Sequence, residues 1–203
     1  IMAIKKRMVG IVGVGHVGAH VAFNLGMMGI ADEVLLCDLK ESKVTSEVQD
    51  LNDAVMYMPN HVIYKASDYA GLKDCDVIVN AVGDITLCAS GSRDGELENS
   101  VKQVADYVPK VMAAGFHGLF VSITNPCDVV ANLIARKSGL PKGYVMGTGT
   151  LLDSSRLIHA ISGQTGLDSR GFTAFMLGEH GNSQIVPWSQ MTFYGKPLSE
   201  MES

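Results

Sequence analysis

Short apolar stretches alternate with longer amphipathic ones along most of this chain. The short stretches are rich in Val and Ile and are typical of strands buried on both faces of a parallel sheet. They cover residues 8–12, 33–38, 62–65, 76–81, 119–123 and 144–146. Helical spacing is found over residues 101–114, 129–137 and 151–163, and a further strand is expected over 172–177. The alternation predicts an α/β fold in which crossover helices join parallel strands.

The segment between the first two strands carries an apolar stripe. Val17, Val21, Leu25 and Met28 recur at helical spacing, and we expect this stripe to pack against the sheet. The segment and its flanking strands would form a βαβ unit, and six strands are enough for a doubly wound sheet. The alternation ends near Gly147. A second, smaller domain is therefore expected to begin there.

Three glycines mark the turn after the first strand. Gly13, Gly15 and Gly18 form G-x-G-x-x-G at the opening of the helix, and Asp38 ends the second strand twenty residues after Gly18. Such glycines let a pyrophosphate approach the backbone at a helix N-terminus, and the acid can bind a ribose 2′-hydroxyl. Asp38 would repel a 2′-phosphate, which favours NAD over NADP, although the nearby Lys40 weakens this preference. An ordinary tight turn and a solvated strand-end acid are the alternatives, and the position between strand and helix disfavours both.

A second group of polar residues lies in the last third of the chain. Asp153 and Arg156 are three residues apart in the helix expected over 151–163, and His180 stands in the sequence G-E-H-G. On one helix face, the carboxylate could orient a histidine and the guanidinium could bind a substrate carboxylate through two hydrogen bonds. The alternative is structural: Thr150 and Asp153 fit a capping-box pattern, in which Asp153 only binds backbone N–H groups. Taken singly, His180 and Arg156 are more often a turn histidine and a solvated helix residue.

These motifs together resemble one enzyme family. The glycine motif and Asp38 are followed by N-P-C-D at 125–128, G-T-G-T-L-L-D at 147–153 with Arg156, and L-G-E-H-G-N-S at 177–183. The same motifs occur in the same order in the L-lactate/malate dehydrogenase family. The resemblance covers essentially the whole chain and is greatest to the L-2-hydroxyisocaproate dehydrogenases of that family. It implies a Rossmann-type NAD-binding domain over residues 1–146 and the N-terminal part of an α+β substrate domain, apparently truncated, over 147–203.

The resemblance also implies a reaction and a set of residues for it. The reaction is hydride and proton transfer between an L-2-hydroxy acid and NAD. His180 would be the general acid and base, Asp153 would fix its tautomer and favour its protonated form, and Arg93 would polarise the substrate carbonyl from a closing loop. The implied substrate-binding residues are Arg156, Asn125, Arg93 and Leu87. The implied cofactor-binding residues are Gly13, Gly15, Gly18, Asp38, Val82, Gly83 and Asn125.

The loop that would select the substrate departs from better-known members. Malate dehydrogenases have an arginine, and lactate dehydrogenases a glutamine, several residues before the loop arginine, where this chain reads D-I-T-L-C-A-S over 84–90. A dicarboxylate would find no second cation there, which disfavours malate dehydrogenase. Leu87 and Cys88 favour a 2-oxo acid with an aliphatic, branched side chain like that of 2-hydroxyisocaproate, with lactate as the other possibility. An extra methylene discriminates by about 1–3 kcal/mol, so we expect a preference and not exclusivity.

Two rival interpretations follow from other features. Family members continue for roughly another third beyond the point where this sequence ends, so an inactive NAD-binding fragment is one alternative. A short-chain dehydrogenase is the other, because Tyr69 and Lys73 match its Tyr-x-x-x-Lys pattern. This pair lies between the third and fourth strands, too early in the sheet to stand beside a nicotinamide.

Composition limits the partners. Sixteen Lys and Arg against 21 Asp and Glu give a net charge of -5, and residues 5–7 are the only dense basic run, which disfavours nucleic acid and anionic membranes. No stretch approaches the roughly 20 apolar residues of a membrane span. Cys37, Cys75, Cys88 and Cys127 lack zinc-site spacing, so we expect no metal and reduced thiols in a cytoplasmic protein. The family resemblance implies a homo-oligomer, a tetramer or a dimer.

Overall fold

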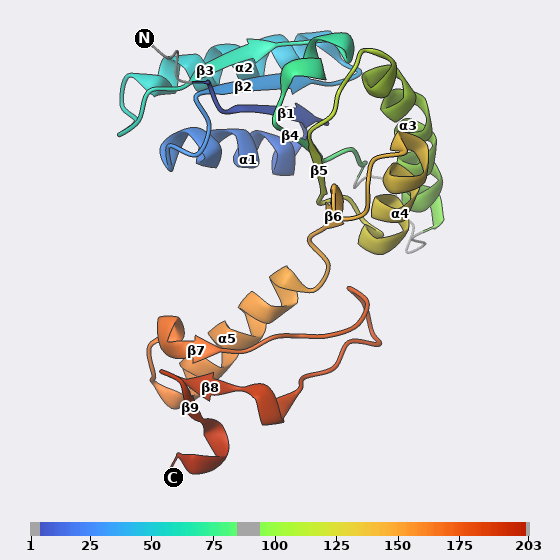
Figure 1. The fold of residues 1–203 in the computed structure, drawn as a ribbon. Coiled ribbons are helices and arrows are strands. Elements are labelled where there is room, and N and C mark those ends of the chain that lie inside the picture. Colours follow the sequence, from blue (N-terminus) through green and yellow to red (C-terminus); the bar gives the residue numbers. More distant parts are fainter. Residues whose placement is uncertain (1–4, 85–93, 202–203) are drawn as a thin grey trace. The chain divides into compact units, whose positions relative to one another are not determined.

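The computed structural model describes residues 5–84 and 94–201. The chain divides into two compact units between Gly147 and Thr148, and each is described by itself. The first unit holds a parallel sheet with helices on both sides, and the second begins with a single helix (Figure 1). None of the helices in the described ranges is long and apolar enough to cross a membrane.

The sheet of the first unit confirms the predicted α/β fold. Its strands are β1 Met8–Val12, β2 Glu33–Cys37, β3 Ile63–Ala66, β4 Val77–Asn80, β5 Leu119–Ser122 and β6 Val145–Gly147. All neighbouring strands are parallel, in the order β3-β2-β1-β4-β5-β6 of a doubly wound nucleotide-binding fold. Each strand begins and ends within one residue of its predicted bounds, because strands buried on both faces are written as continuous apolar runs.

Helices cover both faces of this sheet. They are α1 His16–Met27, α2 Glu41–Val55, α3 Asp94–Ala113 and α4 Cys127–Ser138. Successive residues of β2 point to opposite faces: Leu36 joins the core beneath α1 and α2, and Leu35 joins the core beneath α3 and α4. A short 3-10 helix, η1, spans Ala70–Asp74. The first unit thus has three layers, with the carboxyl ends of all six strands at one edge.

The predicted packing of α1 is only partly correct, because Val21 and Leu25 pack against the core and the other two residues of the stripe do not. Val17 and Met28 are 58% and 68% exposed, and the buried residues of the helix are Gly18, Ala22 and Gly26. A Cβ atom at Gly26 would lie 2.7 Å from Cγ1 of Val62. The helix therefore lies too close to the sheet for large side chains, and its small residues face inward.

Two other helices also differ from the prediction. The sequence pattern identified no helix where α2 lies, although its buried Val44 and Leu51 are seven residues apart, a helical repeat. Helix α3 begins at Asp94, seven residues before its predicted start at Val101. Its N-terminal residues D-G-E-L-E-N-S are mostly polar and carry no apolar stripe. Hydrophobic spacing therefore could not reveal that part of the helix.

The second unit is built around helix α5, Leu151–Thr165. A three-stranded antiparallel sheet follows, formed by β7 Phe172–Thr173, β8 Thr192–Phe193 and β9 Lys196–Pro197. Short 3-10 helices cover Ser169–Gly171, Trp188–Gln190 and Leu198–Glu200.

The strand predicted over 172–177 is much shorter than expected. Only its first two residues form β7. Further along, the Met176 N–H donates to Ser154 Oγ at 2.8 Å, and the Met176 carbonyl accepts from Thr150 Oγ1 at 2.6 Å. Side chains of α5 thus bind the backbone groups that a neighbouring strand would need, which ends the strand.

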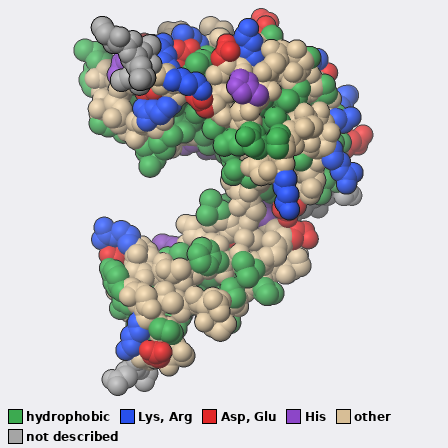
Figure 2. Space-filling model, viewed as in Figure 1, with side chains coloured by type: hydrophobic (Ala, Val, Ile, Leu, Met, Phe, Trp, Pro, Cys, Tyr) green, Lys and Arg blue, Asp and Glu red, His purple; other side chains and the backbone are tan. Residues whose placement is uncertain are grey.

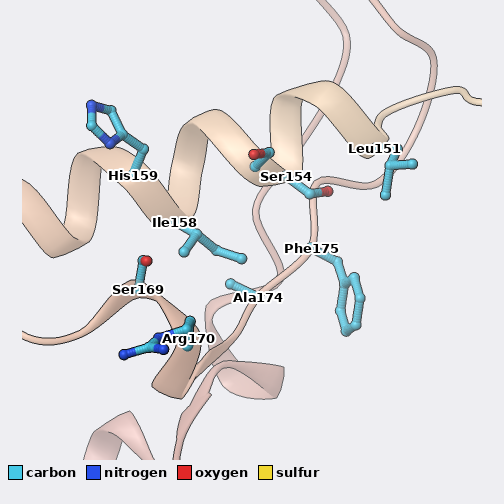
Figure 3. A pocket seen from close by; sticks show the side chains of 9 residues that line it. Leu151, Ser154, Ile158, His159, Ser169, Arg170, Ala174 and Phe175 are labelled. Atoms are coloured by element: carbon cyan, nitrogen blue, oxygen red, sulfur yellow. The ribbon is translucent and has the colours of Figure 1, made fainter. Parts of the chain in front are cut away.

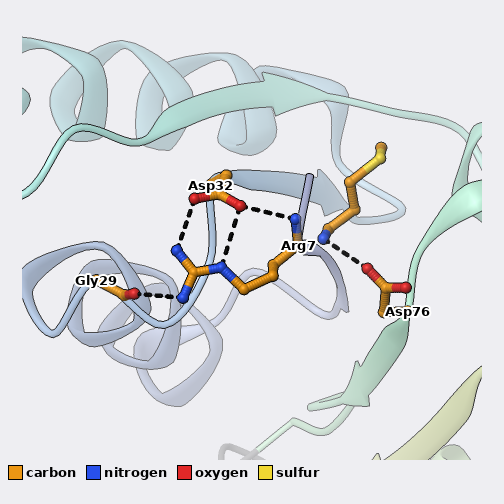
Figure 4. A network of polar contacts seen from close by, with 5 residues as sticks. Arg7, Gly29, Asp32 and Asp76 are labelled. Carbon is orange, nitrogen blue, oxygen red and sulfur yellow. Dashed lines mark hydrogen bonds and ion pairs between the residues drawn. The ribbon is translucent and has the colours of Figure 1, made fainter. Parts of the chain in front are cut away.

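Ion pairs neutralise the basic run at residues 5–7. The partners are Asp76 for Lys5, Glu33 for Lys6 and Asp32 for Arg7. Arg7 binds both carboxylate oxygens of Asp32, at 3.1 and 2.6 Å (Figure 4), and its guanidinium lowers the pKa of Asp32 to about 2. On the face seen in Figure 2, Lys and Arg side chains are interspersed with Asp and Glu. The run therefore forms no isolated cationic surface.

Candidate active site

The glycine motif forms the turn between β1 and α1. Gly13 has a φ of +94°, and its N–H donates to the Cys37 carbonyl at 2.9 Å. A Cβ atom at this position would lie 2.5 Å from the Ala81 carbonyl oxygen. Both the left-handed φ and this close approach require glycine. The turn therefore joins the carboxyl ends of the three central strands.

The N-terminus of α1 suits a pyrophosphate. Gly15 is its N-cap and supplies no side-chain capping bond, and the first turn contains no acidic residue. The space that a Cβ at Gly15 would occupy has no atom within 4 Å. Backbone N–H groups and the positive end of the helix dipole are thus left for an anion.

Asp38 lies at the carboxyl end of β2, beside the glycine turn. Its Oδ2 accepts from the Val14 N–H at 2.7 Å, and its Oδ1 accepts from the Lys40 N–H at 3.0 Å. Two backbone groups fix the carboxylate, and each oxygen retains a lone pair for a hydroxyl donor. The arrangement fits the ribose of NAD.

The remaining cofactor candidates lie at the same edge of the sheet. Val82 and Gly83 follow β4, and Asn125 follows the neighbouring β5. Val82 is buried, whereas Gly83 and Asn125 are exposed. The first unit thus brings together all seven predicted cofactor residues where doubly wound folds bind their ligands. They fit a dinucleotide.

A buried polar network beneath this edge was not predicted. Tyr107 donates to Asn80 Oδ1 at 2.9 Å, and Asn80 Nδ2 donates to the hydroxyls of Ser122 and Thr124 at 3.1 and 3.0 Å. Thr124 donates to the Val82 carbonyl at 2.7 Å. The only feature of the sequence that could have indicated this network is the pair of polar residues, Asn80 and Ser122, at the ends of apolar strands. The network ties β4, β5 and α3 together under the cofactor edge.

The second unit pairs His180 with Asp153. Nδ1 of His180 lies 2.5 Å from Oδ2 of Asp153, and the Asp153 side chain comes from the first turn of α5. Asp153 is 8% exposed and the His180 side chain 24% exposed. The hydrogen bond from His180 is the main cause that lowers the pKa of Asp153. Because an ionised carboxylate can only accept, the hydrogen of this bond belongs to Nδ1 of His180. Nε2 is therefore left to exchange a proton.

Arg156 lies beside this pair. Its Nη1 is 3.6 Å from Oδ1 of Asp153, and its side chain is 68% exposed, so the guanidinium is accessible to an anion. The capping alternative for Asp153 does not describe the structure, because Thr150 makes no side-chain capping bond and instead donates to Met176. Arg93 and Leu87 lie outside the described residues.

The short-chain dehydrogenase alternative has no support from Tyr69. Its ring stacks on Tyr107 at 5.6 Å between centroids, and burial raises the pKa of Tyr69 to about 12. A tyrosine that acts as a base needs a pKa near the working pH. Lys73 lies exposed in η1.

The described cysteines are structural. Cys37, Cys75 and Cys127 are buried and free, and Cys88 lies outside the described residues. Burial raises the pKa of Cys37 and Cys75 to about 12, which makes these thiols unreactive. In the part of the chain that the structure describes, no group of three His, Cys, Asp or Glu side chains could hold a metal ion.

A pocket of about 440 Å³ lies in the second unit, against α5 (Figure 3). It is lined by Leu151, Ser154, Ser155, Ile158, His159, Ser169, Arg170, Ala174 and Phe175. None of the predicted site residues lines it, and Arg170 is paired with Asp168 at 2.7 Å. Arg170 is the one permanently charged cation of the pocket lining, and Asp168 neutralises it. We therefore assign the pocket no role.

Comparison with known proteins identifies the family. Residues 7–147 match the model of the lactate/malate dehydrogenase NAD binding domain. The chain is 41% identical to an L-lactate dehydrogenase of Fusobacterium nucleatum and 41% identical to L-lactate dehydrogenase 1 of Bifidobacterium longum, and the matches cover 96% and 98% of this chain. The crystal structure of a minor L-lactate dehydrogenase from Enterococcus mundtii matches 96% of the chain with a TM-score of 0.91 and 33% identity.

The chain spans about three fifths of the length of these relatives, with 61% and 62% of the two sequences and 62% of the solved structure covered. The family model covers the whole parallel sheet and the glycine motif, and it confirms both the predicted resemblance and the predicted NAD cofactor. The chain therefore belongs to the lactate/malate dehydrogenase family and carries that family's NAD binding domain.

Proposed function

We propose that this chain forms the cofactor-binding and proton-transfer parts of an NAD-dependent L-2-hydroxy acid dehydrogenase. The observation that carries the proposal is the 2.5 Å contact between His180 and Asp153 in a chain of this family. A histidine held by a carboxylate is the arrangement that general acid and base catalysis at a substrate oxygen needs.

In this reaction NAD, when bound, accepts or supplies the hydride. Nε2 of His180 removes the proton from the hydroxyl of the 2-hydroxy acid, and it returns a proton to the carbonyl oxygen in the reverse direction. Asp153 holds the imidazole through Nδ1 and fixes its orientation and tautomer. Arg156 binds the substrate carboxylate through two hydrogen bonds.

The other site residues keep the roles proposed from the family resemblance. Arg93 polarises the reacting carbonyl, and Asn125 binds substrate and helps to place the nicotinamide. Gly13, Gly15, Gly18, Asp38, Val82 and Gly83 bind NAD. We also propose that the protein works in the cytoplasm as a homo-oligomer, a tetramer or a dimer.

The substrate is a small monocarboxylic 2-oxo acid in this proposal. The names of the relatives favour pyruvate and lactate. Leu87 and Cys88 in the sequence 84–90 favour a larger aliphatic side chain, as in 2-oxoisocaproate. The same stretch contains no cation for a second carboxylate, which argues against malate.

A second candidate function is NAD binding without turnover. It is favoured by the distribution of the proposed residues, because the cofactor residues all lie in the first unit, whereas His180, Asp153 and Arg156 lie in the second.

The test is NADH oxidation with 2-oxoisocaproate, pyruvate and oxaloacetate, on protein of verified intact mass. Turnover with either monocarboxylic acid and not with oxaloacetate is the expected result. The variant His180→Asn should lose turnover and keep NADH binding, and His159→Asn, which changes an exposed histidine of the same unit, should behave as wild type. NADH binding without turnover by the wild-type chain would favour the second candidate. Full activity of His180→Asn would exclude the role of His180.

A further inference from the structure

Helix α5, which the structure describes throughout, buries only two of its residues, and both are polar. They are Asp153 and Ser154, 8% and 7% exposed, near the start of the helix. A helix that packs through an apolar stripe would bury apolar side chains instead. Buried polar groups are hydrogen-bonded in folded proteins, so the partners of these two residues show what the start of α5 binds.

Both buried residues bind the segment that carries His180. Asp153 contacts His180 Nδ1 at 2.5 Å, and Ser154 Oγ accepts the Met176 N–H at 2.8 Å. The Ser154 hydroxyl donates its own hydrogen to the Thr150 carbonyl at 2.9 Å, which leaves a lone pair for Met176. Thr150 Oγ1 donates to the Met176 carbonyl at 2.6 Å. The hydroxyls of Thr150 and Ser154 thus bind both backbone groups of one residue, and we call this pair the Met176 clamp.

The loop beyond Met176 is not anchored by apolar burial. Between Ala174 and Met191, a stretch that the structure describes completely, no residue is buried. Leu177 and Ile185 exchange two backbone hydrogen bonds, at 2.9 and 2.8 Å, which close the loop on itself. This bridge fixes the shape of the loop. The position of the loop on α5 therefore depends on the Met176 clamp and on the bond between His180 and Asp153.

We propose that Thr150 and Ser154 are positioning residues for His180. By fixing Met176, four residues before His180, they set the distance between the loop and the helix that carries Asp153. Both hydroxyls are engaged with backbone groups, so neither touches a reacting atom in the mechanism. The inference deepens the proposed function and rests on it for its catalytic meaning.

Loss of the Ser154 hydroxyl leaves the Met176 N–H without its acceptor. An unpaired donor is costly, so the N–H should turn to water, and the base of the loop should move away from α5. Arg156 belongs to α5 itself, and the proposed cofactor residues belong to the other unit, so neither moves with the loop. The rate of proton transfer should therefore fall, whereas the binding of substrate and cofactor should not change.

The first measurement is steady-state NADH oxidation with a 2-oxo acid. Ser154→Ala should lower kcat by roughly ten- to a hundredfold, because a small misplacement of a catalytic group has effects of this size. KM for the 2-oxo acid and Kd for NADH should keep their wild-type values. Ser154→Thr retains the hydroxyl and should restore most of kcat, since the pocket of about 440 Å³ beside Ser154 has room for a methyl group. The control Ser155→Ala removes the exposed hydroxyl of the next residue and should behave as wild type.

The second measurement needs neither cofactor nor substrate. Proton–nitrogen NMR spectra of the whole chain show which ring nitrogen of His180 carries the hydrogen when the imidazole is neutral, and His180→Asn assigns the signals. In the wild type Nδ1 should carry it, because the Asp153 carboxylate accepts there. In Ser154→Ala both nitrogen signals should shift toward the tautomer with the hydrogen on Nε2, and Ser154→Thr should reverse the shift.

Wild-type kcat with unchanged ring signals in a folded Ser154→Ala variant would overturn the inference, and so would a lower kcat that Ser154→Thr does not restore. If Ser154→Ala does not fold, Thr150→Val is judged by the same results, with Thr150→Ser as the variant that keeps the hydroxyl. Shifted ring signals without wild-type turnover would leave the positioning role standing and count against the proposed function. Wild-type turnover with unchanged rates and signals in the variants would do the reverse.

Discussion

Replacing Asp153 by asparagine removes one charge from a nearly buried pair and preserves the size of the side chain. His180 Nδ1 is 2.5 Å from the carboxylate, which is 8% exposed. A hydrogen bond to a charged group contributes about 1.5–3 kcal/mol. Asparagine presents no charge to Nδ1 and can turn its NH2 group toward it, so we expect the loss of the fixed imidazole orientation to cost the transition state about the same amount.

That cost corresponds to roughly 10- to 150-fold in rate. The value of kcat/KM for reduction of the 2-oxo acid by Asp153→Asn should fall by this factor, because the imidazole is no longer held with Nε2 toward the substrate oxygen. The assay is a measurement of kcat/KM for NADH-dependent reduction at neutral pH. NADH affinity should be unchanged, because the proposed cofactor residues all belong to the other unit.

Asp168→Asn is the matched control, since it neutralises a carboxylate of the same unit that is paired only with the exposed Arg170 at 2.7 Å. It should leave kcat/KM unchanged. Wild-type kcat/KM for Asp153→Asn at neutral pH would refute this role of the hydrogen bond.

Four further outcomes are expected. Gly13→Ala should cost about 1–3 kcal/mol in thermal unfolding and weaken NADH binding in a fluorescence titration, because its φ is +94° and its Cβ would meet the Ala81 carbonyl. Asp38→Asn should lower the preference for NADH over NADPH, measured as the ratio of their Kd values, by roughly tenfold, since a repelling charge is removed. Arg156→Leu should raise KM for the 2-oxo acid and leave NADH affinity unchanged. The lowered pKa of Asp153 stabilises the fold above the ordinary carboxyl value of 3.8, and this contribution is lost as pH falls through the lowered value, so Tm should decrease less on acidification in Asp153→Asn than in wild type.

The sequence predicted the sheet well and the helices less well. Buried parallel strands need continuous apolar runs, so their positions can be predicted directly from the sequence. The packing of helix α1 was predicted only in part, because its fully buried residues are Gly18, Ala22 and Gly26, whereas a search for an apolar stripe follows large residues. No local sequence pattern indicates that a helix lies this close to a sheet.

The sequence likewise predicted some features of the candidate site and not others. The glycine motif and Asp38 act through local geometry, and their spacing alone located them at one edge of the sheet. The shortened strand after Phe172 depends on contacts with Thr150 and Ser154 that lie far away in sequence, so no local pattern could predict it.

The hydrogen bonds among Tyr107, Asn80, Ser122 and Thr124 have a thermodynamic consequence. Asn80 donates both Nδ2 hydrogens and accepts at Oδ1, and the network ends on the carbonyl of Val82 at the proposed cofactor edge. The ends of β4 and β5 are therefore ordered before any ligand arrives. Binding at this edge need not lose the conformational entropy of these two strand ends, so more of the contact energy appears as affinity.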